Sequence, residues 1–368
     1  MSLPETDRGF HISVGVAPHA GTALEAEAKL LKPALLYGDR VTLYSPNAAM
    51  VQNLVTLSHM GLGDLFTAVA ALIPEDRRPA IDAKTLQGIE LVSSFEKLPR
   101  RLRRNPEGRR LNADAASVEE ALREQLLSMA ADAGLPGLRM AEAAGLLGVH
   151  AFDRPFDAER VVQDFADSIT RTVEGGATYP LLDDETGSLI QSLWKDGQVR
   201  VSEGLLWKAK VASLASNLLQ RLPLFSASFS EILDVRKELS RSLAAFRGAM
   251  AKFGATLRAE AWDSDFPIEA EKLFVTEVAP TIQQLEDQTR SNSYLKELVP
   301  AWAKHTMVVE ALGLVVSAGT SLAWSALAVG SATAAYEAYT RWKEKAEKVE
   351  QNQLFLLYRI RQRLTDRG

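Results

Sequence analysis

Hydrophobic and polar positions alternate over one short stretch near the N-terminus and recur at helical spacing after it. Residues 10–16 (FHISVGV) alternate and are rich in β-branched side chains, which predicts a strand. Residues 22–37 place leucines at helical spacing among alanine, glutamate and lysine, which predicts a helix. A second strand is predicted over 40–44 and a second helix up to residue 59, with Asn47 as its N-cap. This order of strands and helices predicts a small parallel α/β module.

Beyond residue 112 apolar residues recur at helical spacing along almost the whole chain. Before that point, residues 86–95 favour one more strand. The predicted helices of the middle of the chain cover residues 114–134, 137–149, 156–174, 184–196 and 203–221. The acidic residues 183–185 stand before one of these helices, where they complement its positive end. We therefore expect a predominantly α protein with a small N-terminal α/β module.

The strongest helical signal begins at Ser228. Ser228 and Glu231 have the spacing of a capping box, and apolar residues then recur at alternating intervals of three and four up to Leu257. A seam of this kind needs a partner helix. Residues 268–292 carry a matching seam, so the pattern predicts a long antiparallel helical hairpin.

Residues 311–336 contain no charged side chain. Apolar runs of about twenty residues are long enough to span a bilayer, and this run is also rich in small residues four apart, which let helices pack closely. The small residues expected to mediate helix packing or membrane contact are Gly313, Ser317, Gly319, Ser321, Ala323, Ser325 and Gly330. Three interpretations stay open: a closely packed buried helix or helix pair, conditional or permanent membrane insertion, and self-association of the chain. A basic amphipathic segment over 354–364 suits either an anionic membrane surface or a solvated helix.

Composition and charge exclude several classes of function. The net charge of -5 argues against a protein that binds nucleic acid with its whole surface. The absence of cysteine excludes disulfides, thiol catalysis and cysteine-bound metal. The first residues lack the pattern of a signal peptide, so we expect a cytoplasmic protein with membrane association as an alternative. The composition shifts predict four parts: the α/β module 1–112, a helical domain 113–225, the hairpin 226–298, and the apolar helical element with its basic tail 299–368.

The densest cluster of positive charge lies between residues 100 and 110. Its arginines, a candidate for binding phosphate groups, are Arg100, Arg101, Arg103, Arg104, Arg109 and Arg110. No aromatic residue interleaves with them, so base stacking is not indicated. A loop that is solvated, or that pairs with acidic groups of a partner, explains the cluster equally well.

Neither a catalytic set of residues nor a metal site is predicted. The five histidines do not form a metal-binding pattern, and His19 has no acidic residue at ligand spacing, so we expect them to be structural. The chain contains no nucleotide-binding loop, no nucleophile elbow and no HExxH helix. The turn over 17–21 could bind an anion at the start of the following helix. We expect no cofactor.

Three stretches resemble segments of uncharacterised bacterial proteins that share this order of an α/β start, a helical middle and a small-residue apolar tail. They are Ala34–Pro46, Tyr179–Leu189 and Phe229–Arg247. The resemblance implies a prokaryotic origin and carries no activity and no functional residue.

These observations favour a non-catalytic interaction or effector protein over an enzyme. We expect it to act in a multiprotein assembly with a protein partner or with further copies of itself, and to use residues 307–340 for helix association or conditional membrane insertion. Stress response or antiviral defence is one natural setting for this architecture. One alternative is a protein or enzyme that binds a nucleotide or a nucleic acid through the α/β module and the arginine cluster. Another is a passive structural subunit.

Overall fold

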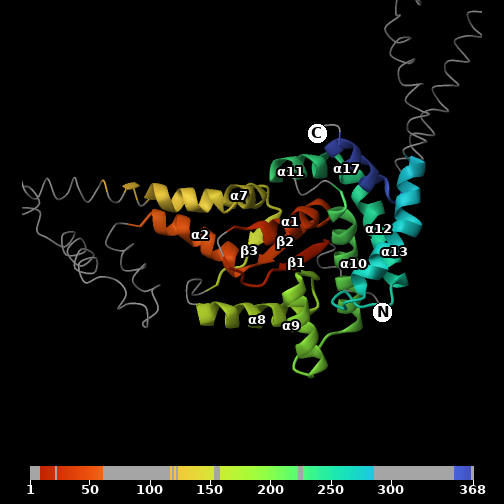
Figure 1. Cartoon of the computed structure of the whole chain (residues 1–368), viewed down its shortest axis with the longest axis horizontal. Helices are drawn as coiled ribbons and strands as arrows, with labels where there is room; N and C mark the ends of the chain where they lie inside the picture. The colour runs from red at the N-terminus through yellow and green to blue at the C-terminus, as the bar shows by residue number, and fades with distance from the viewer. Residues whose placement is uncertain are drawn as a thin grey trace, which may run out of the picture. The chain divides into compact units, whose positions relative to one another are not determined.

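The computed structural model describes residues 9–20, 23–60, 117, 120–121, 123–152, 158–222, 227–285 and 352–365. Two compact units are present. The first, here the α/β unit, draws its described residues from 9–216, 227–234 and 260–262. The second, here the helical unit, draws them from 217–222, 235–259, 263–285 and 352–365. The described residues are mostly helical (Figure 1).

A parallel four-stranded sheet forms the centre of the α/β unit. Its strands are β1 (His11–Gly15), β2 (Arg40–Tyr44), β3 (Leu147–Val149) and β4 (Tyr179–Leu182), in the order β3-β2-β1-β4. The sequence-based strands at the positions of β1 and β2 and the parallel α/β arrangement are thus confirmed. Strand β1 is buried on both faces, as expected of a central parallel strand.

The two remaining strands differ from the sequence-based prediction. Residues 137–149 were expected to be one helix, but that helix, α7 (Leu135–Ala143), ends early and Leu147–Val149 pair with β2. This strand was not predicted, because three residues are too few to show the alternating pattern of a strand. Strand β4 contains Pro180, which argues against a central strand, and it is tolerated because β4 lies at the edge of the sheet.

Helices cover both faces of the sheet. Figure 1 shows α1 and α7 on one side of it and α8 on the other. The helices of this unit, besides α7, are α1 (Glu25–Tyr37), α2 (Pro46–Ser58), α8 (Ala158–Gly175), α9 (Asp184–Lys195), and most of α10 (Glu203–Gln220) and α11 (Phe229–Glu238). The Tyr37 hydroxyl is buried and donates to the carbonyl of Ala212, which fastens α1 to α10.

Helix α8 shows how the sequence periodicity creates the core. Val161, Phe165, Ile169 and Val173 recur every four residues and are all buried. They form one apolar cluster with Ile190 and further residues that face them. An amphipathic helix is stabilised mainly by burying such a stripe, so α8 depends on the sheet that it covers.

Helix α2 begins two residues earlier than predicted. Its N-cap is Ser45, whose Oγ accepts a hydrogen bond from the amide of Ala48 at 3.0 Å, and Pro46 occupies the first helical position. Proline is favoured there because its missing amide hydrogen would have had no helical partner. The expectation that Asn47 is the cap is therefore wrong.

The capping box at the start of α11 is confirmed. The Ser228 amide donates to Glu231 Oε2 at 2.8 Å, and the Glu231 amide donates to Ser228 Oγ at 3.2 Å. The expected thirty-residue helix is divided at Leu239 into α11 and α12 (Ser240–Thr256). Leu239 and the apolar seam residues on both sides of it are buried, so the seam itself continues through the break.

The helical unit continues with α13 (Phe266–Leu273) and a π-helical turn, η2 (Phe274–Val278). Its buried stripe runs through Ala270 and Leu273, then jumps five residues to Val278 and resumes at Ile282 and Leu285. A π-turn inserts one extra residue into the helix, which restores the stripe to the same face after the jump. Helix α17 (Phe355–Thr365) packs on α12. Its residues 355–358 and Ile360 are buried, and so is Leu354, which precedes it.

Candidate functional site

The carboxyl ends of the four strands lie at one edge of the sheet, because all four strands are parallel. From β1 the chain proceeds outward to β2 and β3, then returns to place β4 on the other side of β1. The loops after β1 and β4 therefore leave the sheet in opposite directions. Such a switch point is where open parallel sheets bind ligands.

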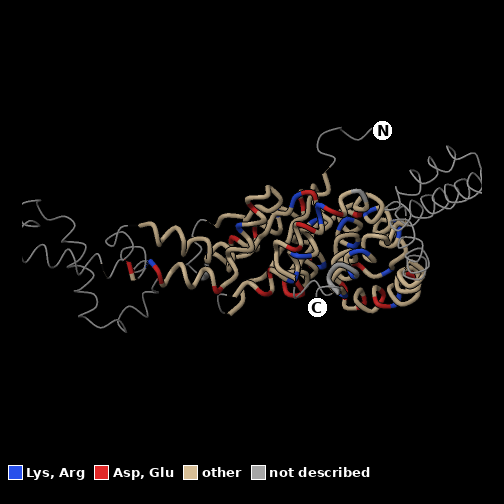
Figure 2. The backbone as a smooth tube through the Cα atoms, turned by 90° about the horizontal axis from the view of Figure 1, so that it is seen from above, with Lys and Arg blue, Asp and Glu red and all other residues tan. Residues whose placement is uncertain are grey.

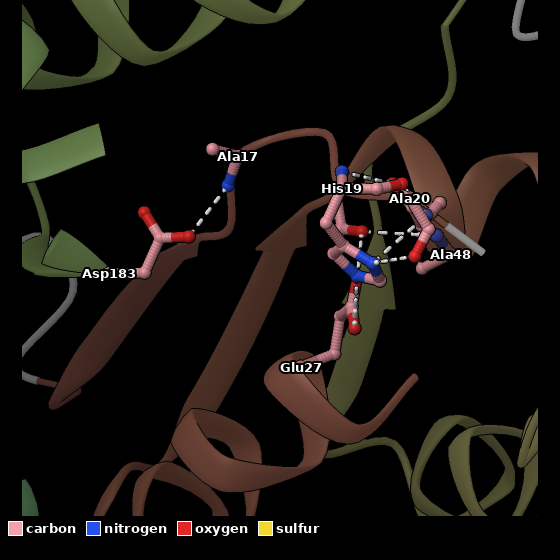
Figure 3. Close-up of polar contacts among 8 residues, drawn as sticks. Ala17, His19, Ala20, Glu27, Ala48 and Asp183 are labelled. Carbon is pink, nitrogen blue, oxygen red and sulfur yellow. Dashed lines mark hydrogen bonds and ion pairs between the residues drawn. The ribbon is translucent and has the colours of Figure 1, made fainter. Parts of the chain in front are cut away.

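Asp183 joins the two loops at the switch point. Its Oδ2 accepts a hydrogen bond from the amide of Ala17 at 2.9 Å (Figure 3). Its Oδ1 accepts one from the amide of Thr186 at 2.8 Å. The second bond is the N-cap of α9. The expected role of the acidic residues 183–185 at this helix start is thus confirmed for Asp183.

A buried carboxylate lies beneath the loop that follows β1. The Glu27 side chain is fully buried, and its Oε1 accepts a hydrogen bond from Ser45 Oγ at 2.6 Å. Both of its oxygens lie 3.2 Å from Nε2 of His19 (Figure 3). Glu27 therefore connects the loop after β1 to the N-cap of α2.

Asn47 fixes the backbone of the same loop. Its Oδ1 accepts from the amide of His19 at 3.2 Å, and its Nδ2 donates to the carbonyl of His19 at 3.0 Å. The side chain of His19 remains 28% exposed. The loop is therefore held by its backbone, while part of the His19 side chain reaches solvent.

A second histidine lies at the same edge, at the end of β3. Nε2 of His150 is 3.2 Å from Oγ of Ser168, and the His150 ring packs against Tyr44 and Phe152. Burial lowers the pKa of His150, and the positive charge of Arg171 lowers it further. At neutral pH His150 is therefore uncharged.

The side chains at this edge of the sheet favour ligands that donate hydrogen bonds over anionic ligands. The N-terminus of α2 is capped by the Ser45 hydroxyl, that of α9 by the Asp183 carboxylate, and the first turn of α1 holds Glu25 and Glu27. The amides of Ala17 and His19, which could have cradled a phosphate in the turn over 17–21, donate to Asp183 and Asn47 instead. Ser45 donates to Glu27 rather than to His19, so these three residues do not form a nucleophilic triad.

Most residues that the sequence singled out are not placed here. The six arginines between 100 and 110, the small residues between 313 and 330, and the strand expected over 86–95 lie outside the described residues. Within the described part of the chain, no group of three or more histidine or acidic residues could hold a metal ion. Acidic and basic residues are interspersed along the described helices (Figure 2).

Sequence reasoning missed the contact between His19 and Glu27, because the two residues are eight positions apart and no ligand spacing joins them. One signal was available. Glu27 shares a helical face with Leu31 and Ala34, which are buried, so a charged residue stood on an apolar stripe. A charge on such a stripe must find a buried partner.

Comparison with known proteins gives no relative: no protein-family model, no curated protein and no solved structure matches this chain. Among the helices that the structure describes, none is both long and apolar enough to cross a membrane.

Proposed function

We propose that the α/β unit binds a small, hydroxyl- or amine-bearing ligand at the switch point between β1 and β4. The observation that carries this proposal is the hydrogen bond between the Ala17 amide and Asp183, which joins the two diverging loops. Ligands of parallel sheets bind beyond the carboxyl ends of the strands at such a point.

The electrostatics of the edge support this ligand class. Carboxylate oxygens accept hydrogen bonds, and Asp183, Asp184 and Glu185 stand together at the start of α9, the last two of them exposed. Phosphate would be repelled here, because the helix N-termini already carry their own acceptors. Phosphate binding through the arginine cluster remains a separate prediction.

The loop after β1 supports the proposal because hydrogen bonds already hold it in one conformation. Asn47 forms hydrogen bonds with both the amide and the carbonyl of His19, and the Glu27 carboxylate contacts Nε2 of the imidazole. A preorganised loop loses little conformational entropy when a ligand binds, which favours affinity.

The test is a thermal-shift screen of the full-length chain against nucleosides, sugars and polyamines, each beside its phosphorylated or acetylated form. A ligand present at a hundred times its Kd stabilises the folded state by about 2.7 kcal/mol. We expect unmodified nucleosides, sugars or amines to raise the Tm, and His19→Ala and Asp183→Asn to weaken their binding at least tenfold. Asp196→Asn, at the other end of α9, is the matched control and should bind normally.

Two results would contradict the proposal. One is a screen in which no unmodified compound binds. The other is a ligand that binds His19→Ala and Asp183→Asn as tightly as the unaltered chain.

A second function, assembly with other protein chains, is favoured by one feature of the helical unit. Ile268 and Val275 lie seven residues apart on α13 and η2 and are 68% and 57% exposed. Large apolar side chains so exposed at this spacing are typical of a helix-pairing surface.

The test of self-assembly is the molar mass of the full-length protein, measured by light scattering. We expect an oligomer that Ile268→Lys with Val275→Lys reduces to a monomer, whereas Leu189→Lys on α9 leaves it intact; a monomer at all concentrations excludes self-assembly.

A further inference from the structure

A serine and a histidine from different elements of the α/β unit meet at the carboxyl edge of the sheet. Ser168 lies on α8, beside the buried stripe of that helix, and His150 directly follows β3. Nε2 of His150 is 3.2 Å from Oγ of Ser168, which is hydrogen-bond distance. We call these two residues the Ser–His pair. A hydroxyl and an imidazole in this contact are the two parts of an activated nucleophile.

The partners of the Ser168 oxygen decide where its proton points. Nη2 of Arg171 lies 3.4 Å from this oxygen, and a guanidinium can only donate hydrogen bonds. Within the described part of the chain, the other partner of the hydroxyl is Nε2 of His150. The hydroxyl therefore donates to Nε2, and the imidazole carries its own proton on Nδ1.

The imidazole is held in place and is ready to accept a proton. The ring of His150 packs against Tyr44, with ring centroids 4.8 Å apart, and meets Phe152 edge-on at 5.0 Å. Because burial and then Arg171 lower the pKa of His150, the ring is uncharged at neutral pH. An uncharged imidazole whose lone pair faces a hydroxyl has the geometry of a general base.

Arg171 places positive charge beside the same oxygen. Its Nε donates to the carbonyl of Asp167 at 3.2 Å, which fixes the guanidinium on the surface of α8. A positive charge there favours the negative charge that develops when a hydroxyl loses its proton and attacks a carbonyl group. Ser168 is only 6% exposed, whereas Arg171 is exposed. The Ser–His pair therefore lies just below the surface, where a small substrate is favoured over a large one.

We propose that Ser168 is a nucleophile with His150 as its general base, and that the pair hydrolyses small esters with an apolar acyl group. The apolar character follows from Phe152 and Phe165, which belong to the buried cluster beside the pair. This inference does not depend on the ligand proposed for the switch point between β1 and β4.

The reaction has two balanced steps. In the first, Oγ of Ser168 bonds to the carbonyl carbon while its proton moves to Nε2 of His150. The bond from that carbon to the alcohol oxygen then breaks, and Nε2 returns the proton to the alcohol. In the second step, water attacks the acyl carbon and gives a proton to Nε2. The bond from the carbon to Oγ breaks, the acid leaves, and Oγ takes the proton back.

A serine-directed fluorophosphonate and p-nitrophenyl acetate test the proposal on the full-length chain. We expect a single fluorophosphonate adduct, which peptide mass spectrometry places on Ser168, and ester hydrolysis that this adduct blocks. His150→Gln should slow both reactions roughly 100-fold or more, because a general base contributes about 100- to 10,000-fold. Circular dichroism checks that the variant is folded. Ser188→Ala, which removes an exposed hydroxyl on α9, is the matched control and should react normally.

Three results would overturn the proposal. The first is the absence of an adduct on Ser168 of the unaltered chain, a measurement that needs no variant to fold. The second is the absence of ester hydrolysis by the unaltered chain. The third is hydrolysis that persists in Ser168→Ala or is unchanged in folded His150→Gln.

Discussion

The Ser45 hydroxyl donates a 2.6 Å hydrogen bond to Oε1 of Glu27, and both side chains are fully buried. The same hydroxyl accepts the amide of Ala48 at the start of α2. One buried carboxylate therefore supports a helix cap, and through His19 it also supports the loop at the proposed ligand site.

Replacing Glu27 should destabilise the α/β unit. Glu27→Leu leaves the Ser45 hydroxyl and the His19 imidazole without their acceptor, which should lower the free energy of unfolding by about 2–4 kcal/mol. Glu27→Gln should cost less, since its carbonyl oxygen still accepts from Ser45. Urea unfolding followed by circular dichroism measures both. Glu25→Gln, exposed on the same helix, is the control; an equal loss in Glu25→Gln would count against the role given to Glu27.

Removing the cap of α9 should lower the free energy of unfolding. The size of the loss should depend on whether residue 183 keeps a hydrogen-bond acceptor, and not on its charge. Asp183→Ala loses the bonds to the amides of Thr186 and Ala17 and should cost about 1–2 kcal/mol. Asp183→Asn keeps an acceptor and should cost about half as much or less. The exposed neighbour Asp184→Ala, measured by the same unfolding experiment, should change stability by under about 0.5 kcal/mol. Equal losses for Asp183→Ala and Asp184→Ala would contradict this assignment.

Two glycines in the sheet should respond differently to alanine. A Cβ at Gly15 would lie 2.7 Å from Leu182 Cδ2 and 2.9 Å from Ile169 Cδ1, whereas a Cβ at Gly148 would meet nothing within 4 Å. Gly15→Ala should therefore lower the free energy of unfolding by about 1–3 kcal/mol through overpacking. Gly148→Ala should be neutral or slightly stabilising. Similar unfolding midpoints for the two variants would show that Leu182 and Ile169 yield without cost.

His150 should make the protein less stable in mild acid. Because burial and then Arg171 lower its pKa in the folded state, the unfolded chain takes up the proton more readily. The contribution of neutral His150 is fully present above its ordinary pKa of 6.5 and is lost as the pH falls through the lowered value.

The difference in Tm between pH 8 and pH 5.5 measures this effect. It should be smaller in His150→Gln than in the unaltered chain, because glutamine does not titrate. Arg171→Gln should also reduce it, by removing the second cause of the lowered pKa. An unchanged difference in both variants would rule out His150 as the source.

The folded structure confirms two sequence signals that act over a few residues, the capping box and the stripe of α8. The Ser228–Glu231 capping box forms because both partners lie within one turn of helix. The stripe of α8 is buried as its period predicts. Strands β3 and β4 gave no such signal, since β3 is three residues long and β4 contains Pro180, a residue that argues against a strand. Their strand conformation depends on pairing with β2 and β1, which are distant in sequence.

The sequence alone determined that this protein is mostly helical with an N-terminal α/β module, because helix period, strand alternation and capping are local properties of the chain. It also determined that residues 311–336 carry no charge. Only the tertiary structure decided the strand order that creates the switch point, the burial of Glu27 against His19 and Ser45, and the contact of Leu285 with Phe355 and Tyr358. These depend on which distant segments meet, and packing of the whole chain selects those contacts rather than any local preference.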